Sequence, residues 1–454
     1  MKKRVLVFCT LMVFLFSCFA CGKAPSAELP EDASSTPAPY EPGLTYHEVY
    51  DSDTDFDNRF GMYADSVVET EDAYYYLSYC GNYLYYYDKA SGERGVLCGK
   101  PECTHDAERE NSGCGGYAAV SGTTLNYLNG KLYYLAQDIS NHCYAVYTLN
   151  PDGSEKTREA LVDLNSAAPG FTPHRCDLHR GMFYASGQFQ TVVSAVPTLR
   201  TCILSIDPEN GEIKTIYTVD EKLAVESTET YTDPETGESF DYAEYDQTSV
   251  SDAPALFYYR QYVYFCLCRE DADEDGTKHS VIELRRFDTE TEQTEEVWLG
   301  KTEKAIGRNC RIWVEAEDRI YLMPAGAPEG ASAALYLLSG GELKPVFAFD
   351  RSGTGFLSDG VAACYDQQAH YMELRDLTGE VIFAGMWELD ASDQSDPKTT
   401  ENGYITSFYG DRSRVFASYY LFPQDGSGTL RKYLVSYDLT GGSPQAELIA
   451  FDPW

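Results

Sequence analysis

The chain has 454 residues and a formal net charge of −37. So large an excess of acidic side chains repels the phosphate backbone of nucleic acids, which excludes nucleic acid as a partner. The same charge favours cations, neutral glycans or basic partners.

Residues 1–20 have the layout of an export signal. Lys2, Lys3 and Arg4 precede an apolar run over residues 5–20, which is shorter than the ~20 residues that span a bilayer. Ala20-Cys21-Gly22 follows where a cleavage site belongs, and the whole segment resembles a bacterial lipoprotein signal. That resemblance implies that Cys21 is lipidated and becomes the mature N-terminus, with Cys18 as a second candidate. A plain secretory signal or an uncleaved anchor is the alternative. We therefore expect a protein that is lipid-anchored to the cell membrane at its extracytoplasmic face.

Residues 21–44 are rich in Pro, Ser, Ala and acidic residues. Such a segment buries too little apolar surface to offset the entropy of ordering it, so we expect a disordered tether. Residues 45–454 would then form the globular part, which is longer than one ordinary hydrophobic core supports. The globular part should therefore consist either of two domains or of a shell that is built from repeated units.

A two-part pattern recurs seven times along the globular part. The first part is a polar turn followed by a short aromatic strand, as in Asn129-Gly130-Lys131-Leu132-Tyr133-Tyr134. The second part is a strand, a turn containing Asp or Asn, and another strand, as in LSIDPENGEIKTIY. In such turns Pro presets one φ angle, and Gly or Asn accepts a positive φ. Between turns, apolar and polar residues alternate with the period of a β-strand.

This recurrence predicts an all-β fold, namely a β-propeller with seven blades and irregular loops between them. Eight blades, or six with an appendage, stay open as alternatives. Residues 45–57 are expected to supply the strand that closes the ring onto the last blade. Residues 221–252 are expected to form an insertion with a hairpin at Pro234-Glu235-Thr236-Gly237 on one rim.

Residues 98–114, CGKPECTHDAERENSGC, contain four donor side chains that suit a metal ion: Cys98, Cys103, His105 and Cys114. Four such donors complete a tetrahedral zinc site, although the spacing is not that of a standard zinc finger. A disulfide and an unbonded loop are the alternatives. The eleven cysteines after Cys21 are odd in number and scattered through apolar strands, which argues against a disulfide scaffold.

Asp271, Asp273 and Asp275, followed by Gly276, reproduce the start of a calcium-binding loop. Position twelve of this loop is Ile282, so the closing carboxylate is missing. A solvated acidic hairpin tip is the alternative. Asp51, Asp53, Asp55 and Asp57 alternate in the same way, but Phe56 stands where Gly is needed.

The run YYDKASGERGVLCGKPECTHD together with Cys114 resembles a group of uncharacterised lipid-anchored β-propeller lipoproteins from Gram-positive anaerobic bacteria. The motif covers about 30 residues. No activity is established for that group, so the resemblance implies a fold and a location only.

The sequence contains no recognisable catalytic motif, so no catalytic residue is predicted. We expect a binding or scaffold module whose ligand, a glycan or an envelope protein, meets one rim or the central channel. The 37 tyrosines suit stacking on sugars, although their period-two positions mark most of them as strand-packing residues. The alternative function is a cell-surface enzyme that acts on glycans with carboxylates in the channel.

Overall fold

The computed structural model describes residues 44–61, 65–78, 81–105, 111, 113–118, 124–138, 141–194, 196–232, 239–246, 250–273, 275–302, 306–325, 333–387, 403–421 and 431–452. Residues 42–454 form one compact unit. The predicted signal over 1–20, the tether up to residue 43, and both Cys18 and Cys21 lie outside the described residues. None of the helices in the described part is long and apolar enough to cross a membrane.

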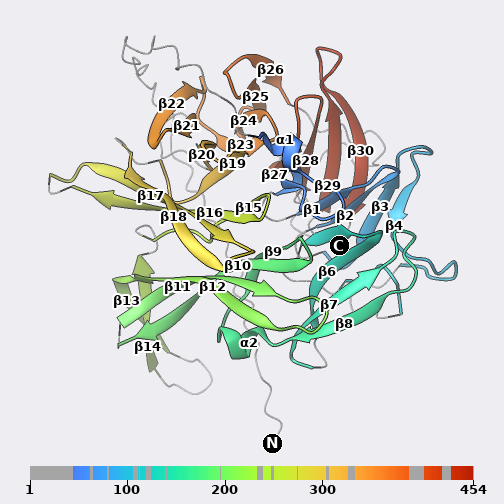
Figure 1. Ribbon diagram of the computed structural model, residues 1–454, viewed down its shortest axis with the longest axis horizontal. Coiled ribbons are helices and arrows are strands. Elements are labelled where there is room, and N and C mark those ends of the chain that lie inside the picture. Colours follow the sequence, from blue (N-terminus) through green and yellow to red (C-terminus); the bar gives the residue numbers. More distant parts are fainter. Residues whose placement is uncertain are drawn as a thin grey trace, which may run out of the picture. The chain divides into compact units, whose positions relative to one another are not determined.

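Seven four-stranded antiparallel sheets follow one another along the chain and stand in a ring, as Figure 1 shows. Blade 1 consists of β1 (Ser66–Glu69), β2 (Ala73–Leu77), β3 (Leu84–Asp88) and β4 (Arg94–Val96). Blade 2 consists of β5 (Leu125–Leu128), β6 (Lys131–Asp138), β7 (Cys143–Leu149) and β8 (Thr157–Val162). Blade 3 consists of β9 (Pro173–His179), β10 (Met182–Val193), β11 (Val196–Ile206) and β12 (Ile213–Lys222). Blade 4 consists of β15 (Leu256–Tyr259), β16 (Tyr262–Ala272), β17 (Lys278–Asp288) and β18 (Gln293–Lys301).

The remaining three blades repeat this order. Blade 5 consists of β19 (Cys310–Ala316), β20 (Arg319–Pro324), β21 (Ala334–Ser339) and β22 (Glu342–Ala348). Blade 6 consists of β23 (Thr354–Ser358), β24 (Val361–Asp366), β25 (Tyr371–Asp376) and β26 (Val381–Met386). Blade 7 consists of β27 (Gly403–Gly410), β28 (Arg414–Leu421), β29 (Arg431–Asp438) and β30 (Gln445–Asp452). The protein is therefore a seven-bladed β-propeller, and the predicted all-β fold is confirmed.

An aspartate at the end of the third strand shapes the last turn of most blades. Asp207, for example, accepts a hydrogen bond from the Glu209 backbone N–H at 2.8 Å, and Gly211 completes the turn with a φ of +75°. In four other blades, the turn between the third and fourth strands has the same hydrogen bond, from a backbone N–H to the carboxylate of the aspartate two residues earlier. These aspartates are Asp88, Asp288, Asp376 and Asp438. These turns are the second part of the sequence repeat, which is why the blades could be counted from the sequence.

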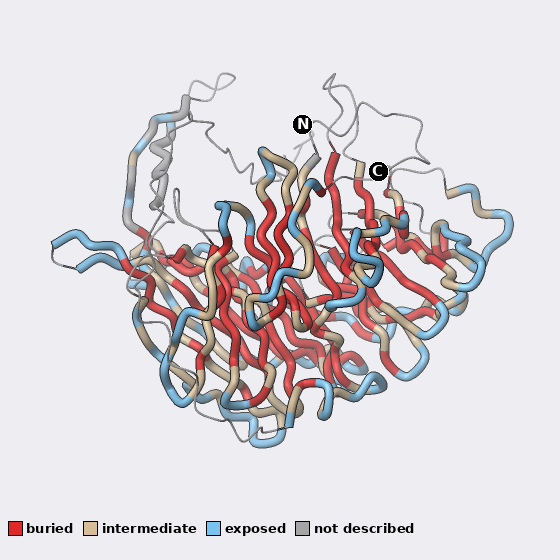
Figure 2. Tube along the Cα trace, turned by 90° about the horizontal axis from the view of Figure 1, so that it is seen from above, coloured by how far each residue is buried: buried red, intermediate tan, exposed pale blue. Residues whose placement is uncertain are grey.

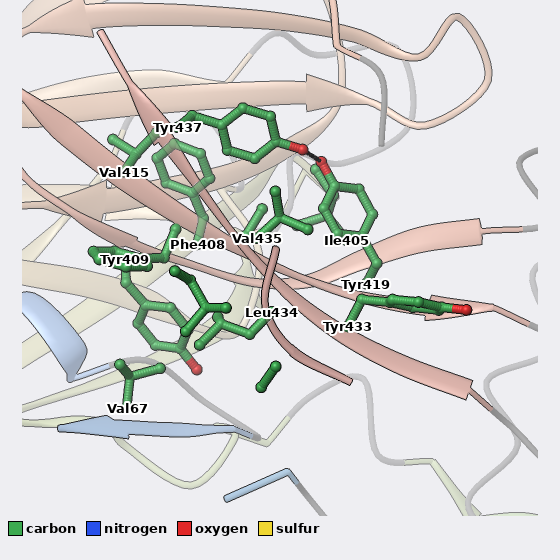
Figure 3. Close-up of a cluster of buried hydrophobic side chains, with 14 of the residues drawn as sticks. Val67, Ile405, Phe408, Tyr409, Val415, Tyr419, Tyr433, Leu434, Val435 and Tyr437 are labelled. Carbon is green, nitrogen blue, oxygen red and sulfur yellow. Dashed lines mark hydrogen bonds between the residues drawn. The ribbon is translucent and has the colours of Figure 1, made fainter. Parts of the chain in front are cut away.

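Aromatic side chains fill the spaces between neighbouring blades. Figure 2 shows buried residues along the strands and exposed residues at the turns. Figure 3 shows the cluster around blade 7, where the hydroxyl groups of Tyr419 and Tyr437 meet. The indole nitrogen of Trp387, from blade 6, donates to the Tyr419 hydroxyl at 2.8 Å. The hydroxyl groups of Tyr419 and Tyr437 are therefore hydrogen-bonded although both side chains are buried.

The prediction that residues 45–57 form a ring-closing strand is wrong. This segment contains helix α1 (Tyr46–Val49), a turn, and the approach to the 3₁₀ helix η1 (Asn58–Phe60). Local polar groups fold it this way: Thr45 and Glu48 form a capping box, and Asp51 accepts the Asp53 backbone N–H at 3.0 Å.

Blade 7 takes all four strands from its own sequence, and side-chain contacts join it to blade 1. The Tyr85 hydroxyl donates to Asp452 at 3.0 Å, and Arg94 donates to the Leu448 carbonyl oxygen at 2.9 Å. Ring closure therefore depends on side chains and not on a shared sheet.

Two strands between blades 3 and 4 form the predicted insertion. β13 (Ala224–Thr232) pairs antiparallel with β14 (Ser239–Asp246), apart from the blades. The predicted turn, Pro234–Gly237, lies outside the described residues. The short helix α2 (Leu164–Ala167) lies in the connection from blade 2 to blade 3.

Candidate functional site

The segment over residues 44–61, which we call the plug, lies at the centre of the ring. Asn58 holds it to blade 4, since its Nδ2 donates to the Tyr258 carbonyl oxygen at 2.6 Å and its Oδ1 accepts the Tyr258 N–H at 2.9 Å. The Ser358 hydroxyl of blade 6 donates to the Arg59 carbonyl oxygen at 3.2 Å, and η1 contacts β1 and β27. Figure 1 shows α1 among these first strands.

The plug occupies one end of the ring. The Arg180 N–H donates to the Thr54 carbonyl oxygen at 2.6 Å, and His47 contacts Asp359 at 2.9 Å. Arg180 and Asp359 both lie in turns that join the first strand of a blade to its second. We call this end, which bears the first-to-second strand turns, the closed face.

A cavity of about 170 Å³ lies beyond the plug, toward the end of the ring where the first strands begin. Asn58 and Gly61 of the plug line it on one side. The blades contribute Ala255, Leu256, Phe257, Asn309, Arg311, Ile312, Trp313, Leu357 and Thr406. We call it the channel cavity.

Arg311 is the cationic group among the residues that line the channel cavity. Its guanidinium carbon lies 5.0 Å from the centre of the Phe356 ring. Burial is the main influence on this side chain and lowers the pKa of Arg311 to about 10. The structure therefore maintains a positive charge in a partly desolvated cavity.

The acidic groups of the channel are engaged in polar contacts inside the protein. Asp177 accepts hydrogen bonds from Arg175 at 2.7 Å and from the Tyr258 hydroxyl at 3.0 Å. Burial raises the pKa of Asp177, and its ion pair with Arg175 opposes that shift. Asp65 accepts from the Tyr420 hydroxyl at 3.1 Å and from the Thr406 hydroxyl at 3.3 Å. Both carboxylates are almost completely buried, so they act as internal structural groups.

The four predicted metal ligands meet in the connection between β4 and β5. The donor atoms of Cys98, Cys103, His105 and Cys114 all lie within 4.8 Å of one another, and Cys114 Sγ is 3.4 Å from His105 Nδ1. Tetrahedral coordination at zinc–sulfur and zinc–nitrogen lengths of about 2.3 and 2.0 Å places sulfur and nitrogen about 3.5 Å apart. The four residues could therefore hold a metal ion. We call this group the Cys₃His cluster.

The three cysteines of this loop are not bonded to one another in the structure. Every described cysteine is a free thiol, the three in the Cys₃His cluster included. His105 has a positive φ of 54°, which a non-glycine residue adopts at some energetic cost. His105 therefore has a strained backbone conformation, and its ring nitrogen lies beside a thiol of the cluster.

Backbone amides and a lysine surround the thiols. Burial tends to raise the pKa of Cys98, but hydrogen bonds from the backbone N–H groups of Lys100, Gly115 and Gly116 outweigh it, and the pKa is lowered. Lys156 is half-buried beside the thiols and donates to the Tyr117 carbonyl oxygen. Three thiolates and one Zn²⁺ would carry a net charge of −1, which the Lys156 ammonium would balance.

Glycines make room for Cys98. A Cβ atom on Gly153, which has a φ of +77°, would lie 2.8 Å from the Cys98 backbone nitrogen. One on Gly115 would lie 2.6 Å from the Gly153 carbonyl oxygen. The third-to-fourth strand turn of blade 2 therefore packs directly against the Cys₃His cluster and joins blade 1 to blade 2.

The calcium candidates lie at the tip of the hairpin formed by β16 and β17. Asp271 pairs with His279 across the hairpin, and Asp275 accepts the Thr277 backbone N–H at 2.9 Å. The carboxylates of Asp271 and Asp273 lie 3.7 Å from different nitrogens of the His279 ring. Within the described residues, the Cys₃His cluster is the group in which three or more such donors converge. Calcium binding at this tip stays a prediction.

Sequence reasoning missed the plug and the channel cavity. Asn58, Asn309 and Arg311 belong to no motif, and the residues they join are up to 200 positions apart. The one available signal was the density of Asp and Asn over residues 51–58, which is typical of turns and not of a strand.

Comparisons with known proteins give only distant likenesses to solved structures. No protein-family model matches the chain, and no curated protein matches it. A puromycin-hydrolysing peptidase of Mycobacterium tuberculosis is 10% identical over 86% of this chain and 54% of its own, with a TM-score of 0.45. An oligogalacturonate lyase of Vibrio parahaemolyticus is 10% identical over 89% of this chain and 92% of its own, with a TM-score of 0.42.

The β-propeller domain of the Trilobed protease of Pyrococcus furiosus is 11% identical over 84% of this chain and 95% of its own, with a TM-score of 0.40. The chain thus spans about half the length of the Mycobacterium peptidase. At these identities and TM-scores the three proteins say nothing about activity.

Proposed function

We propose that this protein is a lipid-anchored, extracytoplasmic binding module whose ligand enters the channel cavity from the end of the ring opposite the plug. The chemistry of the cavity wall is the observation that carries the proposal. Its described residues offer amides, one guanidinium, one hydroxyl and aromatic rings, but no carboxylate, histidine or thiol. These groups recognise a ligand, whereas general acid–base catalysis needs a group that titrates near neutral pH.

The plug supports the orientation that a lipid anchor would require. Leu44, the first described residue, accepts a hydrogen bond from the Tyr259 hydroxyl, and Tyr259 ends the first strand of blade 4 at the closed face. A tether that leads from Cys21 to Leu44 therefore joins the propeller at its closed face. The opposite end of the ring then stays accessible to ligands.

We further propose that the Cys₃His cluster holds a structural zinc ion. Four donors fill a tetrahedral shell, and soft thiolates with one imidazole suit zinc. The ion would join the loop after blade 1 to blade 2. The ion would stabilise the folded protein. Because all four coordination positions would be filled by protein ligands, no catalytic role is assigned to it.

A glycan-active enzyme is the second candidate, favoured by one groove at the closed face. This groove, of about 500 Å³ between blades 7 and 1, is lined by three carboxylates, Glu69, Asp411 and Glu447, and two tyrosines, Tyr74 and Tyr87. Glu69 pairs with Arg59 and Lys89, and Glu447 accepts from Tyr87. Hydrogen bonds outweigh burial and lower the pKa of Asp411. Glycoside hydrolysis needs one carboxyl group held protonated, so the binding module is the better supported function.

A ligand screen on the purified full chain tests the proposal. Envelope glycans, peptides and small organic acids are scored by the rise in melting temperature, because a ligand that binds only the folded state stabilises it. The matched variant is Leu357→Phe, which narrows the channel cavity. We expect a ligand that raises the melting temperature of the wild type but not of this variant, without chemical change to the ligand. Product formation that is lost in Glu447→Gln would support the enzyme instead.

A further inference from the structure

The groove between blades 7 and 1, which we call the closed-face groove, holds charges of both signs around a volume of about 500 Å³. That volume is in the range of sites that bind small molecules. Three cations and three carboxylates line it: Arg59, Lys89, Arg414, Glu69, Asp411 and Glu447. Charge complementarity favours a ligand that also carries both signs.

Two of the three cations are neutralised inside the protein. Arg59 lies 2.7 Å from a carboxylate oxygen of Asp57 and 3.1 Å from one of Glu69. Lys89 lies 2.8 Å from the other oxygen of Glu69. These short ion pairs leave Arg59 and Lys89 little charge to offer a ligand.

Arg414 is held less closely than the other two cations. The carboxylate of Asp438 is 3.9 Å away, which is beyond hydrogen-bond distance, and the guanidinium donates to the Tyr74 hydroxyl at 3.4 Å. The Arg414 side chain is 38% exposed. A guanidinium has more N–H donors than these two contacts use, so Arg414 keeps donors for a ligand.

Glu447 is the carboxylate of the groove that lacks an ion pair. Glu69 and Asp411 both pair with Arg59, whereas Glu447 is exposed and, within the described part of the chain, pairs with no cation. It accepts a hydrogen bond from the Tyr87 hydroxyl. Burial and this contact raise the pKa of Tyr87 to about 12, so the phenol is neutral and does not balance the carboxylate.

Arg414 and Glu447 lie on one face of blade 7. Arg414 is opposite Asp438 of β29, and Glu447 is opposite Ser436 of the same strand. Residues two positions apart on a strand share a face, and both side chains make their hydrogen bonds to tyrosines of blade 1. Both residues belong to the described part of the chain, and they form no ion pair with each other. The groove therefore presents a cation and an anion that face the same space without meeting.

We propose that the closed-face groove binds an α-amino acid as a zwitterion, with its carboxylate on Arg414 and its ammonium group on Glu447. Both charged groups of an α-amino acid are attached to the same carbon atom, so the molecule can bridge a cation and an anion that do not meet directly. Each contact is a charge-assisted hydrogen bond. The groove is separate from the channel cavity, so this inference goes beyond the proposed function.

Calorimetric titration of the full chain with glycine and with L-leucine tests the inference. Glycine has no side chain that could be excluded by shape, and leucine has an apolar one. The amide of each amino acid lacks the carboxylate, and its N-acetyl derivative lacks the ammonium group. We expect at least one of the two amino acids to bind about tenfold more tightly than both of its derivatives, because hydrogen bonds between charged groups are the stronger ones. Failure of both amino acids to bind, or equal binding of a derivative, would overturn the proposal.

Two variants assign the two ends of the ligand. Arg414→Gln should abolish the preference for the amino acid over its amide, because the cation that binds the carboxylate is gone. Glu447→Gln should abolish the preference over the N-acetyl derivative, and its side chain still offers an acceptor to Tyr87.

Arg351→Gln is the matched control for these variants. It removes an arginine of blade 6 that is 47% exposed and paired with Asp366 at 3.3 Å. This variant should bind the amino acid and reject both derivatives as the wild type does. Wild-type preferences in Arg414→Gln or in Glu447→Gln would show that the amino acid is not held by these two residues.

Discussion

Asn58 and Tyr258 are joined like two residues of neighbouring strands, although one belongs to the plug and the other to blade 4. The amide of Asn58 satisfies both the N–H and the carbonyl oxygen of Tyr258, at 2.9 and 2.6 Å, and both residues are buried. A first strand in the ring interior has no further strand to pair with. The Asn58 side chain takes the place of that missing strand.

Replacing Asn58 by Ala should therefore destabilise the whole unit. Two buried backbone groups would lose their partners, at a cost of about 1–3 kcal/mol each. We expect a lower free energy of unfolding in a urea titration, measured by tryptophan fluorescence. Asn165→Ala is the control, since Asn165 is exposed on α2, and its titration should match the wild type. Equal midpoints for Asn58→Ala and wild type would show that the plug is not part of the folded core.

His179 connects the plug to the ring through a neutral imidazole. Its Nδ1 accepts the Phe56 backbone N–H at 3.2 Å, so the proton lies on Nε2, which donates to the Arg260 carbonyl oxygen at 2.8 Å. Burial lowers the pKa of His179 from 6.5 to about 4, and Arg180 adds to this while Asp55, at 3.7 Å, opposes it. Protonation would remove the acceptor for Phe56.

The free energy of unfolding should decrease as the pH decreases, because of this histidine. Above pH 6.5 the His179 side chain is neutral in both the folded and the unfolded protein, so its titration does not lower the stability. Between pH 6.5 and about 4 the unfolded chain takes up a proton that the folded protein does not, which costs about 1.4 kcal/mol per pH unit. Below pH 4 the loss levels off at about 3 kcal/mol.

Urea titrations at pH 7.0, 6.0 and 5.0 measure this slope. His179→Asn keeps an acceptor for the Phe56 N–H, but its side chain does not titrate. Lowering the pH should therefore reduce its free energy of unfolding less than that of the wild type. His142→Asn, which changes an exposed histidine, should keep the wild-type slope. A steep slope in His179→Asn would assign the pH dependence to other groups.

Features formed by residues close together in the sequence could be predicted, whereas contacts between residues far apart in the sequence could not. The Asp207 turn and its counterparts recur within short windows, so the blades could be counted. The Cys₃His cluster lies within 17 consecutive residues, so its members could be found by donor chemistry alone. Asn58 contacts Tyr258 across 200 positions, and no composition or spacing rule relates the two. The segment before η1 was misjudged because its alternation of acidic residues looks like a strand, whereas its carboxylates bond to their own backbone.

Removing one cluster thiol should abolish binding of the proposed zinc ion. Purified wild-type chain should contain about one zinc per chain by elemental analysis, and Cys103→Ser should contain much less, because a tetrahedral site needs all four donors. Cys143→Ser is the control: Cys143 is partly buried in the same way but lies outside the Cys₃His cluster. A chelator should lower the melting temperature of wild type and Cys143→Ser, and leave Cys103→Ser unchanged. Zinc-free wild type with two thiols fewer than expected in a thiol titration would indicate a disulfide.

The packing of blade 2 against Cys98 can be tested without touching a ligand. Gly153 and Gly341 have nearly the same φ, +77° and +79°, so alanine imposes similar backbone strain at either position. Only at Gly153 would the new methyl group collide, 2.8 Å from the Cys98 nitrogen, whereas Gly341 has no atom within 4 Å. Both variants should lose about 1 kcal/mol of stability from strain. Gly153→Ala should in addition lose zinc at a chelator concentration that Gly341→Ala withstands, because displacement of Cys98 opens the tetrahedral shell. Equal zinc retention in the two variants would mean that the turn of blade 2 does not position the Cys₃His cluster.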